Sequence, residues 1–288
     1  MLRSRSGDRP GVARGDDAAV LDRPEGRLVV CTDAGVEGVH LDTTAFPIDD
    51  LAYRTAIAAL SDLAATGARP LGVLVAVCAP GHVDVVDVVR GAAEACATAG
   101  CEVVGGDLSR SATTTVVASA VGVEGAGGAV ARRGARPGDA VLVTGALGGA
   151  AAGLRRRRAG APLDDPLVLR HRRPSARLDE GEAAALCGAT AMLDVSDGLA
   201  RDVRRLAAAS EVGVALSRVP VEDGATPEEA LGGGEDYELV FTHPDAAAAR
   251  AAFARAGLRE PISLGEVVAR ATDLTFRGEP LDDVGWRH

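Results

Sequence analysis

The sequence predicts an α/β or α+β fold in two domains, each with its own strands and helices. Two patterns support this prediction. Short apolar runs of strand length alternate with longer segments of helical spacing between residues 27 and 268. A Gly- and Arg-rich stretch at 125–138 interrupts the alternation, and such a stretch is typical of a domain boundary. We therefore expect an N-terminal domain at 1–130 and a C-terminal domain at 131–288.

The predicted N-terminal domain opens with a strand at 27–32 and a helix from Asp49 to about Gly67. Asp49 and Asp50 suit the first turn of a helix, because the helix dipole is positive there. The other elements expected in this domain are a helix at 83–99 and strands at 71–79, 102–104 and 113–124.

The predicted C-terminal domain opens with a strand at 140–144 that leads into a Gly-rich turn. The turn does not match the dinucleotide-binding fingerprint, because Leu147 stands where the second glycine is required. We expect residues 155–158, all Arg, to form the solvated end of a helix and residues 162–174 to form a loop. The other expected elements are helices near 175–187, 198–210 and 245–256, and strands near 191–195, 213–217, 237–242 and 262–268.

Composition limits the chemistry that the chain can perform. Every one of the 31 basic residues is Arg, and the sequence contains no Lys. This excludes a Walker A loop, a protein-kinase-type active site and Schiff-base catalysis, since all of these use a Lys side chain. The net charge of −10 argues against nucleic-acid binding, which requires a basic face.

The sequence also indicates the cellular setting. Its five Cys residues show no CxxC spacing, and an odd number of Cys is typical of reduced thiols in a cytosolic protein. No signal peptide is recognisable, and the longest apolar run, at 71–80, is too short to cross a membrane. We expect a cytoplasmic protein that binds neither nucleic acid nor membranes.

Six short acidic motifs recur along the chain, and most of them interrupt or end a run of small apolar residues. A carboxylate is costly to bury unless a cation meets it. Carboxylates repeated in this way are expected to gather around hard divalent cations, which is a common means of holding a polyphosphate. The motifs are GDD at 15–17, TD at 32–33, SD at 61–62, GGD at 105–107, DVSDG at 194–198 and GEDYE at 234–238.

Most of these motifs also have a simpler explanation. Residues 15–17 are typical of a turn, and residues 194–198 of a helix N-terminus. The latter lack the spacing of an EF-hand calcium loop, since Leu199 occupies the position of the required Gly. Asp62 is harder to explain, because it lies inside an apolar helical stretch, and we expect it to be buried and metal-bound.

Two single residues keep both a structural and a functional interpretation. His40 follows the TD motif closely, but a lone His is more often structural than functional. Trp286, the only Trp, could pack on the surface or serve as a platform for stacking.

Taken in order, these motifs resemble the thiamine-monophosphate kinase family, within the superfamily of ATP-binding aminoimidazole-ribotide synthetases. The resemblance covers nearly the whole chain, and LSDLAATGA together with GGEDYEL is its most specific pair. The matching stretches are GDDAAV (15–20), TDAGVEGVHL (32–41), DLAYRTAIAALSDLAATGARP (50–70), GGDLSRS (105–111), RPGDAVLVTGALGGAAAGL (136–154), DVSDGLARDV (194–203), GGGEDYELVFT (232–242) and GWRH (285–288).

The resemblance implies an activity and an assembly. Members of the family transfer the γ-phosphate of ATP directly to thiamine monophosphate, which yields thiamine diphosphate and ADP in the last step of thiamine diphosphate biosynthesis. They use Mg²⁺, several ions per site, and usually K⁺. The family implies a homodimer in which the N-terminal mixed sheets join into a barrel across the interface, while the C-terminal α/β domain folds over the nucleotide.

The resemblance also implies roles for individual residues, none of them as a general acid or base. The implied substrate contacts are His40, Glu235 and Trp286. The implied nucleotide contacts are Gly106, Asp107, Arg132 and Ser196. The implied metal ligands are Asp17, Cys31, Thr32, Asp33, Asp62, Asp107, Asp194 and Asp197.

Two alternatives stay open at this point. Another synthetase of the superfamily, acting on aminoimidazole ribotide or selenide, or a hydrogenase-maturation protein, would be expected to carry a nucleophilic Cys or Lys near its start or a Cys in its tail. Cys31 instead lies within a predicted strand, and the tail is GWRH. A catalytically silent sensor of nucleotides or thiamine phosphate is the second alternative, although every expected acid is present.

Overall fold

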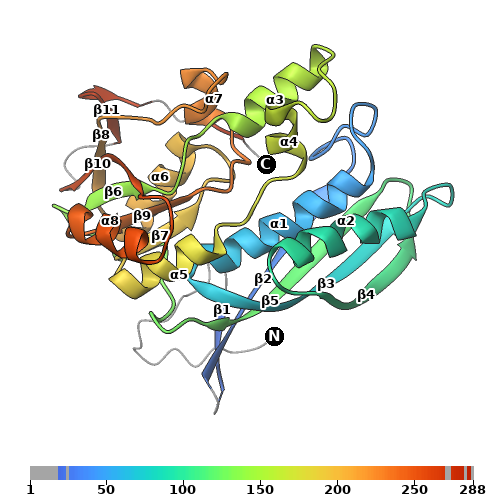
Figure 1. Ribbon diagram of the computed structural model, residues 1–288, viewed down its shortest axis with the longest axis horizontal. Coiled ribbons are helices and arrows are strands. Elements are labelled where there is room, and N and C mark those ends of the chain that lie inside the picture. Colours follow the sequence, from blue (N-terminus) through green and yellow to red (C-terminus); the bar gives the residue numbers. More distant parts are fainter. Residues whose placement is uncertain (1–18, 24–25, 270–273, 282–283, 287–288) are drawn as a thin grey trace.

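The computed structural model describes residues 19–23, 26–269, 274–281 and 284–286. Within them the chain forms two mixed sheets with helices packed against them (Figure 1). The first sheet has five strands in the order β1-β2-β5-β3-β4, and only β3 and β4 run parallel. Its strands are β1 (Ala19–Arg23), β2 (Gly26–Val36), β3 (Ala68–Ala79), β4 (Val103–Arg110) and β5 (Thr115–Glu124).

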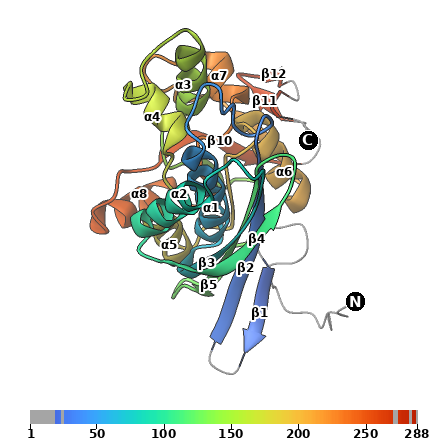
Figure 2. The same cartoon turned by 90° about the vertical axis from the view of Figure 1, so that its right-hand side faces the viewer.

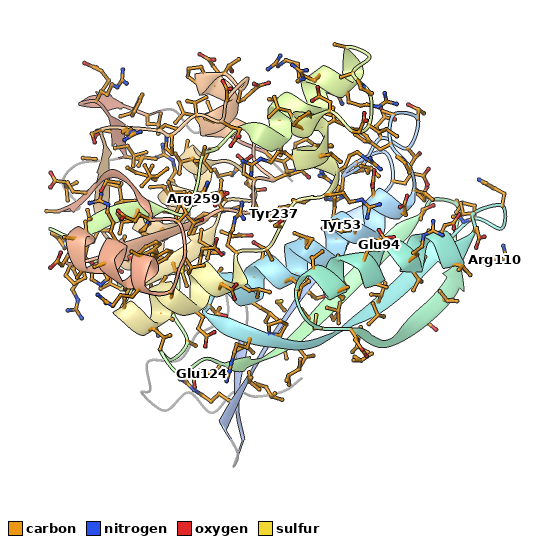
Figure 3. All side chains as sticks on the ribbon, viewed as in Figure 1. Tyr53, Glu94, Arg110, Glu124, Tyr237 and Arg259 are labelled. Atoms are coloured by element: carbon orange, nitrogen blue, oxygen red, sulfur yellow. The ribbon has the colours of Figure 1, made fainter. Side chains whose placement is uncertain are left out.

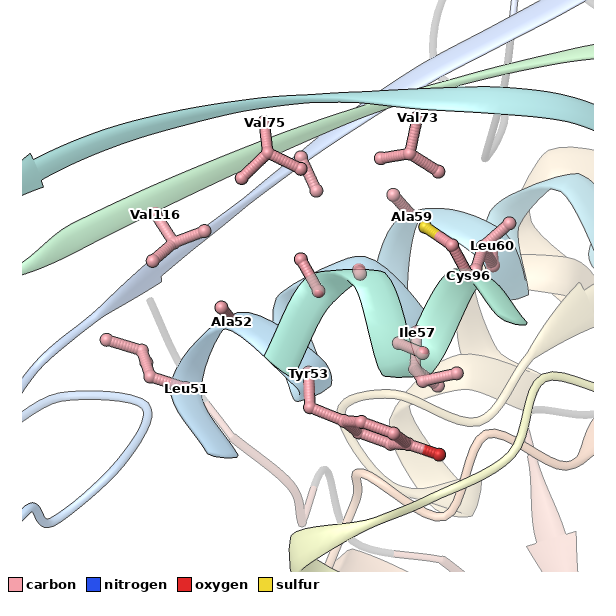
Figure 4. Packing of buried hydrophobic residues seen from close by; sticks show 14 of the residues in the cluster. Leu51, Ala52, Tyr53, Ile57, Ala59, Leu60, Val73, Val75, Cys96 and Val116 are labelled. Carbon is pink, nitrogen blue, oxygen red and sulfur yellow. The ribbon is translucent and has the colours of Figure 1, made fainter. Parts of the chain in front are cut away.

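Helices α1 (Asp49–Ala65) and α2 (Val85–Thr98) cover one face of this sheet, and Figure 2 shows its other face without a helix. The covered face is apolar because alternate residues of β3, Val73, Val75 and Val77, point toward the helices and are buried. Figure 4 shows Val73 and Val75 above Ile57 and Leu60 of α1.

The second sheet has seven strands in the order β12-β11-β8-β10-β6-β9-β7. Its strands are β6 (Ala140–Val143), β7 (Ala191–Asp194), β8 (Gly213–Leu216), β9 (Leu239–His243), β10 (Ile262–Val268), β11 (Thr275–Phe276) and β12 (Glu279–Pro280). The helices of this half are α3 (Gly149–Arg158), α4 (Pro166–Arg172), α5 (Leu178–Cys187), α6 (Leu199–Ser210), α7 (Pro227–Gly232) and α8 (Ala246–Arg255).

The C-terminal end of α1 joins the two halves. Ala64 and Ala65 belong to the same buried cluster as Met192 of β7 and Phe241 of β9. Helix α5 approaches α1 closely at Gly181, where an added Cβ would lie 2.1 Å from the carbonyl oxygen of Ala64. The C-terminal part of α1, which contains Ser61 and Asp62, is therefore held against the second half of the chain.

Most predicted elements are confirmed, but two strands run well past their predicted ends. The strand predicted at 27–32 continues to Val36, and the strand predicted at 102–104 continues to Arg110 as β4. The polar and glycine residues of the TD and GGD motifs were expected to end these strands. Pairing with β5 and β3 satisfies their backbone groups, so both motifs lie inside strands.

The loop predicted at 162–174 is wrong, because α4 occupies most of it. Asp165 begins this helix: its side chain accepts hydrogen bonds from the backbone of Leu167 and Val168, and Pro166 follows as the first residue of the helix. Helix α7 was also missed, although Thr226 and Glu229 form a capping box there. Strands β1, β11 and β12 were not predicted either.

The solvated helix end predicted at 155–158 is confirmed, because α3 ends at Arg158 and Arg155, Arg156 and Arg158 are exposed. Arg155 pairs with Glu229 at 2.7 Å, and Arg157 donates to the carbonyl oxygen of Ala45 at 2.8 Å.

In the described parts of the chain, no helix combines the length and the apolarity needed to span a lipid bilayer. The division into 1–130 and 131–288 stays a prediction.

Candidate active site

The implied metal ligands of β2 point in two directions. Asp33 is in register with Ala118 of β5, which is in register with Val75 of β3, and both partners are buried on the face that the helices cover. Cys31 lies on the same face, and its Sγ donates to the carbonyl oxygen of Ala59 in α1 at 3.0 Å. Asp33 thus points toward α1. The Cys31 thiol packs against that helix, and sulfur is a soft ligand that suits Mg²⁺ poorly.

Thr32 and Asp107 lie on the opposite, uncovered face. The Oγ1 of Thr32 is 2.9 Å from the Oγ of Ser119, and Ser119 is in register with Leu74, which is 44% exposed. Asp107 of β4 is in register with Ala76, two residues after Leu74 and therefore on the same face. Within one protomer, a single ion cannot bind both Asp33 and Asp107.

Gly106 allows β4 to approach β3 beside Asp107. A Cβ at this position would lie 1.8 Å from the carbonyl oxygen of Val75, which is part of the neighbouring backbone. Only glycine therefore fits next to the Asp107 carboxylate. The Oγ of Ser109 donates to one oxygen of that carboxylate at 3.0 Å and restricts its orientation.

The loop between β7 and α6 is shaped by Asp202. One oxygen of its carboxylate accepts hydrogen bonds from three successive backbone amides, those of Ser196 at 3.0 Å, Asp197 at 3.0 Å and Gly198 at 3.1 Å. Arg205 donates to the other oxygen at 2.9 Å and also pairs with Asp197. The side chain of Asp202 is buried, so these bonds are made out of contact with water.

Ser61 connects this loop to α1. Its Oγ donates to the Oδ2 of Asp194 at 2.6 Å, and both side chains are buried. Asp62 was expected to be buried, but the structure leaves it partly exposed and buries its neighbour Ser61 instead. The reason is helical geometry, because adjacent residues point about 100° apart and only one of them can face the second half.

The loop between α7 and β9 carries Glu235. Its backbone amide donates to the carbonyl oxygen of Ser196 at 2.8 Å, and the amide of Tyr237 donates to that of Val195 at 3.1 Å. Glu235 and Tyr237 both have positive φ, 58° and 51°, which costs about 1 kcal/mol per residue outside glycine. Asp236 stabilises the loop further, because its carboxylate accepts from the amides of Gly148 at 2.6 Å and Ala150 at 3.1 Å.

Tyr237 lies where carboxylates from both halves converge. Figure 3 shows it in the region between the two halves, and its side chain is buried. Burial raises the pKa of Tyr237 well above its ordinary value, and the negative charges of Glu235, Asp33 and Asp194 raise it further, against the opposing effect of Arg54. The phenol therefore stays protonated, and three implied site residues surround it.

The implied substrate residues come from three distant segments. His40 accepts a hydrogen bond from the backbone of Val36 through Nδ1 at 3.0 Å, so its Nε2 carries the proton of the neutral ring. Trp286 is 48% exposed, and its backbone amide donates to the carbonyl oxygen of Asp197 at 3.0 Å. The segment around Trp286 is thereby held against the loop that Asp202 shapes.

Two family models match the chain. The AIR synthase related protein, N-terminal domain, covers residues 15–148, and the AIR synthase related protein, C-terminal domain, covers residues 136–275. The thiamine-monophosphate kinase of Halobacterium salinarum is 38% identical over 95% of this chain and 94% of its own length. That of Escherichia coli K12 is 35% identical over 95% of this chain and 90% of its own length.

The chain belongs to the thiamine-monophosphate kinase family. Solved structures agree with this family assignment: AaThiL complexed with AMPPCP and TMP has a TM-score of 0.84 at 31% identity and covers 95% of this chain and 91% of its own. Thiamine monophosphate kinase from Aquifex aeolicus has a TM-score of 0.79 at 29% identity, with 92% of both chains covered. The mixed α/β fold in two parts is confirmed by these matches.

The hydrogenase maturation protein HypE in its complex with HypF shares the fold alone, with a TM-score of 0.75 at 21% identity. This likeness carries no argument about function. The alternative of a hydrogenase-maturation protein therefore gains no support beyond the fold that thiamine-monophosphate kinases also have.

Not every site residue that the family implies is brought together. Glu235, Asp33 and Asp194 all raise the pKa of Tyr237 by their charge, whereas Thr32 and Asp107 lie on the other face of the sheet. Arg132 follows Ala131, whose carbonyl oxygen accepts from the amide of Met192 at 3.0 Å, so it lies beside β7. Asp17 lies outside the described residues.

The donor atoms suit a hard cation, although no site is preformed. In the part of the chain that the structure describes, no three His, Cys, Asp or Glu side chains are arranged to hold a metal ion. Mg²⁺ is usually bound by one or two carboxylates together with waters and substrate phosphates. The small groups of carboxylate and hydroxyl side chains at this site fit that mode of binding. They would not fit a metal site in which the protein supplies every ligand.

Four residues of the site were not singled out from the sequence: Arg54, Ser61, Asp202 and Tyr237. Three of them stand within or beside the acidic motifs, and that proximity was the available signal for Ser61, Asp202 and Tyr237. Arg54 gave no such signal, because its partner Glu235 is 181 residues away.

Proposed function

We propose that this chain catalyses the ATP-dependent phosphorylation of thiamine monophosphate, which yields thiamine diphosphate and ADP. The observation that carries the proposal is the match to AaThiL complexed with AMPPCP and TMP over 95% of the chain. Relatives named thiamine-monophosphate kinase that span nearly the full length support it. The absence of Lys makes this a kinase without a P-loop.

The chemistry fits a site rich in carboxylates and poor in general bases. A phosphate acceptor is already anionic near neutral pH, so no strong base is needed to activate it. The difficulty is to bring two polyanions together in line, because their charges repel strongly in a partly dry site. Positioning and charge neutralisation are therefore what the protein has to supply.

We assign Mg²⁺ to the acids of the site, and K⁺ remains part of the proposal. When bound, Mg²⁺ would supply the positive charge that the two phosphate groups require. Asp33 and Asp194, with Asp62 beside Ser61, form the group on the covered side, and Asp197 follows in the next loop. Thr32 and Asp107 form the group on the uncovered side, and Asp17 is assigned on family resemblance alone.

The nucleotide and the acceptor are assigned to neighbouring surfaces. Gly106 and Asp107 of β4, Arg132 and Ser196 are the proposed nucleotide contacts. His40, Glu235 and Trp286 are the proposed thiamine monophosphate contacts. The bond between the amide of Glu235 and the carbonyl oxygen of Ser196, 2.8 Å, supports this arrangement because it joins one residue of each set.

We further propose that two copies associate through the uncovered face of the first sheet, in the cytoplasm where ATP is available. Leu71 and Leu74 of β3 are 53% and 44% exposed there, and Val104 of β4 is 61% exposed at the sheet edge. Monomeric proteins rarely expose so contiguous an apolar surface. Neither sheet closes into a barrel among the described residues of one chain, so a barrel requires the second copy.

An assay of product formation tests the proposed function. Purified protein with ATP, Mg²⁺ and thiamine monophosphate is expected to form thiamine diphosphate and ADP in equal amounts, and omission of Mg²⁺ should abolish turnover. Asp62→Asn is expected to lose turnover while it keeps binding thiamine monophosphate, because Asp62 is assigned to the metal. If the wild-type protein forms no thiamine diphosphate under these conditions, the proposal is wrong.

A further inference from the structure

Arg54 of α1 is a buried cation that contacts three separate segments of the chain. Its side chain is 4% exposed. The guanidinium donates to the carbonyl oxygen of His171 at the end of α4 and to the Oε1 of Glu235. One of its nitrogens also lies 3.5 Å from the carbonyl oxygen of His40. A planar fork with five donors suits such a junction.

Glu235 is the main partner of the Arg54 charge. Burial disfavours the charged guanidinium, but the negative charge and hydrogen bond of Glu235, together with Tyr237 and Asp50, leave the pKa of Arg54 raised. His171 offers no competing charge, since burial and the positive charges of Arg54 and Arg158 lower its pKa well below the ordinary value. The Arg54–Glu235 pair is therefore the charged contact at this junction of α1, α4 and the Glu235 loop.

The carboxylate of Glu235 keeps one oxygen available. Arg54 binds Oε1, while Oε2 lies 3.9 Å from the Nδ1 of neutral His171, beyond hydrogen-bond distance. Glu235 is 33% exposed, so the second oxygen can reach a ligand. The backbone of Glu235 is fixed by Ser196, and its side chain is fixed by Arg54 from the other half.

We infer that Arg54 is a positioning residue for the acceptor substrate: it sets the orientation of Glu235 and the distance between Glu235 and the His40 segment. This inference rests on the proposed function. Thiamine monophosphate carries a cationic thiazolium, for which an oriented carboxylate is a suitable partner. Because Arg54 is buried, its effect is expected to reach the substrate mainly through Glu235.

Steady-state kinetics of Arg54→Met, Arg54→Lys and Glu235→Gln test the inference. Arg54→Met is expected to raise the KM for thiamine monophosphate about tenfold or more, while the KM for ATP stays within about twofold of wild type. Arg54→Lys should have a KM for thiamine monophosphate between those of wild type and Arg54→Met, because it keeps the positive charge but loses the planar guanidinium. The matched control is Arg172→Met, which removes another Arg that pairs with a buried acid of α1, Asp50, at 2.6 Å. It should lower Tm without changing either KM.

The double variant Arg54→Met/Glu235→Gln tests the inference even if Arg54→Met alone folds poorly, because the double variant removes both charges of the pair. Its KM for thiamine monophosphate should match that of Glu235→Gln within about twofold. A further tenfold rise in the double variant overturns the inference. So does an Arg54→Met variant that changes both KM values equally, or that behaves like Arg172→Met.

Binding without turnover separates this inference from the proposed function. Trp286 is the only Trp, so its fluorescence can follow the binding of thiamine monophosphate directly. If wild-type protein binds thiamine monophosphate but forms no product, the proposed function fails and the Arg54 variants still test the inference by their dissociation constants. A dissociation constant for Arg54→Met equal to that of wild type overturns it.

Discussion

The acids of the first sheet and the acids of the second half are held in place by different means. Asp33 and Asp107 stand inside strands, where the ladder of backbone hydrogen bonds fixes their positions and the register decides which face they occupy. Asp194 and Asp197 stand at and after the end of a strand, where buried side chains such as Ser61 and Asp202 fix the loop. The backbone of an acid on a strand is therefore positioned by the ladder itself, whereas that of an acid on a loop depends on neighbouring side chains.

This difference predicts where substitutions damage the fold and where they damage only the chemistry. A strand acid can be replaced without loss of the ladder, because its side chain takes no part in the backbone bonds. A side chain that holds a loop cannot, because the amides that it bonds would be left buried and unsatisfied. The predictions below follow this contrast from the largest expected change in stability to the smallest.

The largest effect is expected for Asp202→Ala. It removes the acceptor of the Ser196, Asp197 and Gly198 amides, and we expect a loss of about 3 kcal/mol in the free energy of unfolding, together with nearly all activity. Denaturant unfolding and the product assay measure the two changes. The control is Asp84→Ala, since Asp84 accepts from only one amide, that of Val86, at an exposed helix start.

For the control, a loss of about 1 kcal/mol with unchanged activity is expected, as for an ordinary helix cap. A loss for Asp202→Ala no larger than that for Asp84→Ala would show that the loop is held by something other than the Asp202 carboxylate, and the contrast between loops and strands would fail.

The same contrast explains what the sequence could and could not reveal. Most helices, most strands and the residue types of the site follow from local patterns, such as the acidic first turn at Asp49 and the apolar alternation of β3. The faces of Asp33 and Asp107 depend on register with distant partners, Ala118 and Ala76, which cannot be obtained from local spacing. Arg54 depends on a partner still further along the chain.

An intermediate effect is expected from the acid that anchors the Glu235 loop. Burial raises the pKa of Asp236 from 3.8 to about 6, against the opposing effect of the Gly148 and Ala150 amides. Because the folded state binds the proton more tightly than the unfolded state, stability is greater at low pH and falls as the pH rises between these two values. The fall should amount to about 1–3 kcal/mol and should be absent in Asp236→Asn.

Thermal unfolding between pH 4 and pH 6 measures this fall for wild type and Asp236→Asn. The measurement is made at about 10 mM salt and again at a higher salt concentration. Asp245→Asn is the matched control. Asp245 caps α8 by accepting from Ala248 and Ala247, and these bonds lower its pKa below 3.8, so its contribution is lost only below the pH range of the experiment and Asp245→Asn should keep the wild-type slope. If Asp236→Asn leaves the pH dependence of thermal stability unchanged, burial does not raise the pKa of Asp236 and this prediction is wrong.

The smallest change in stability, under about 0.5 kcal/mol, is expected for the strand acid Asp107, whose side chain is exposed on β4. Asp107→Asn and Asp33→Asn should nevertheless both abolish phosphoryl transfer, because each removes a proposed metal ligand. The two acids lie on opposite faces of one sheet, and Asp33 points away from the proposed dimer interface, so a mixed dimer can show whether one site takes both acids from the same copy.

Co-expression of the two inactive variants with different affinity tags tests this arrangement. If each site used Asp33 of one copy and Asp107 of the other, one site of a mixed dimer would combine both substitutions and the other would have none, so the purified mixture of all dimers would recover about a quarter of wild-type activity. If each site used both acids of one protomer, every site in the mixed dimer would carry one substitution and no activity would return. A mixture as inactive as its two parents would therefore contradict the division of the site between copies while leaving the proposed reaction intact.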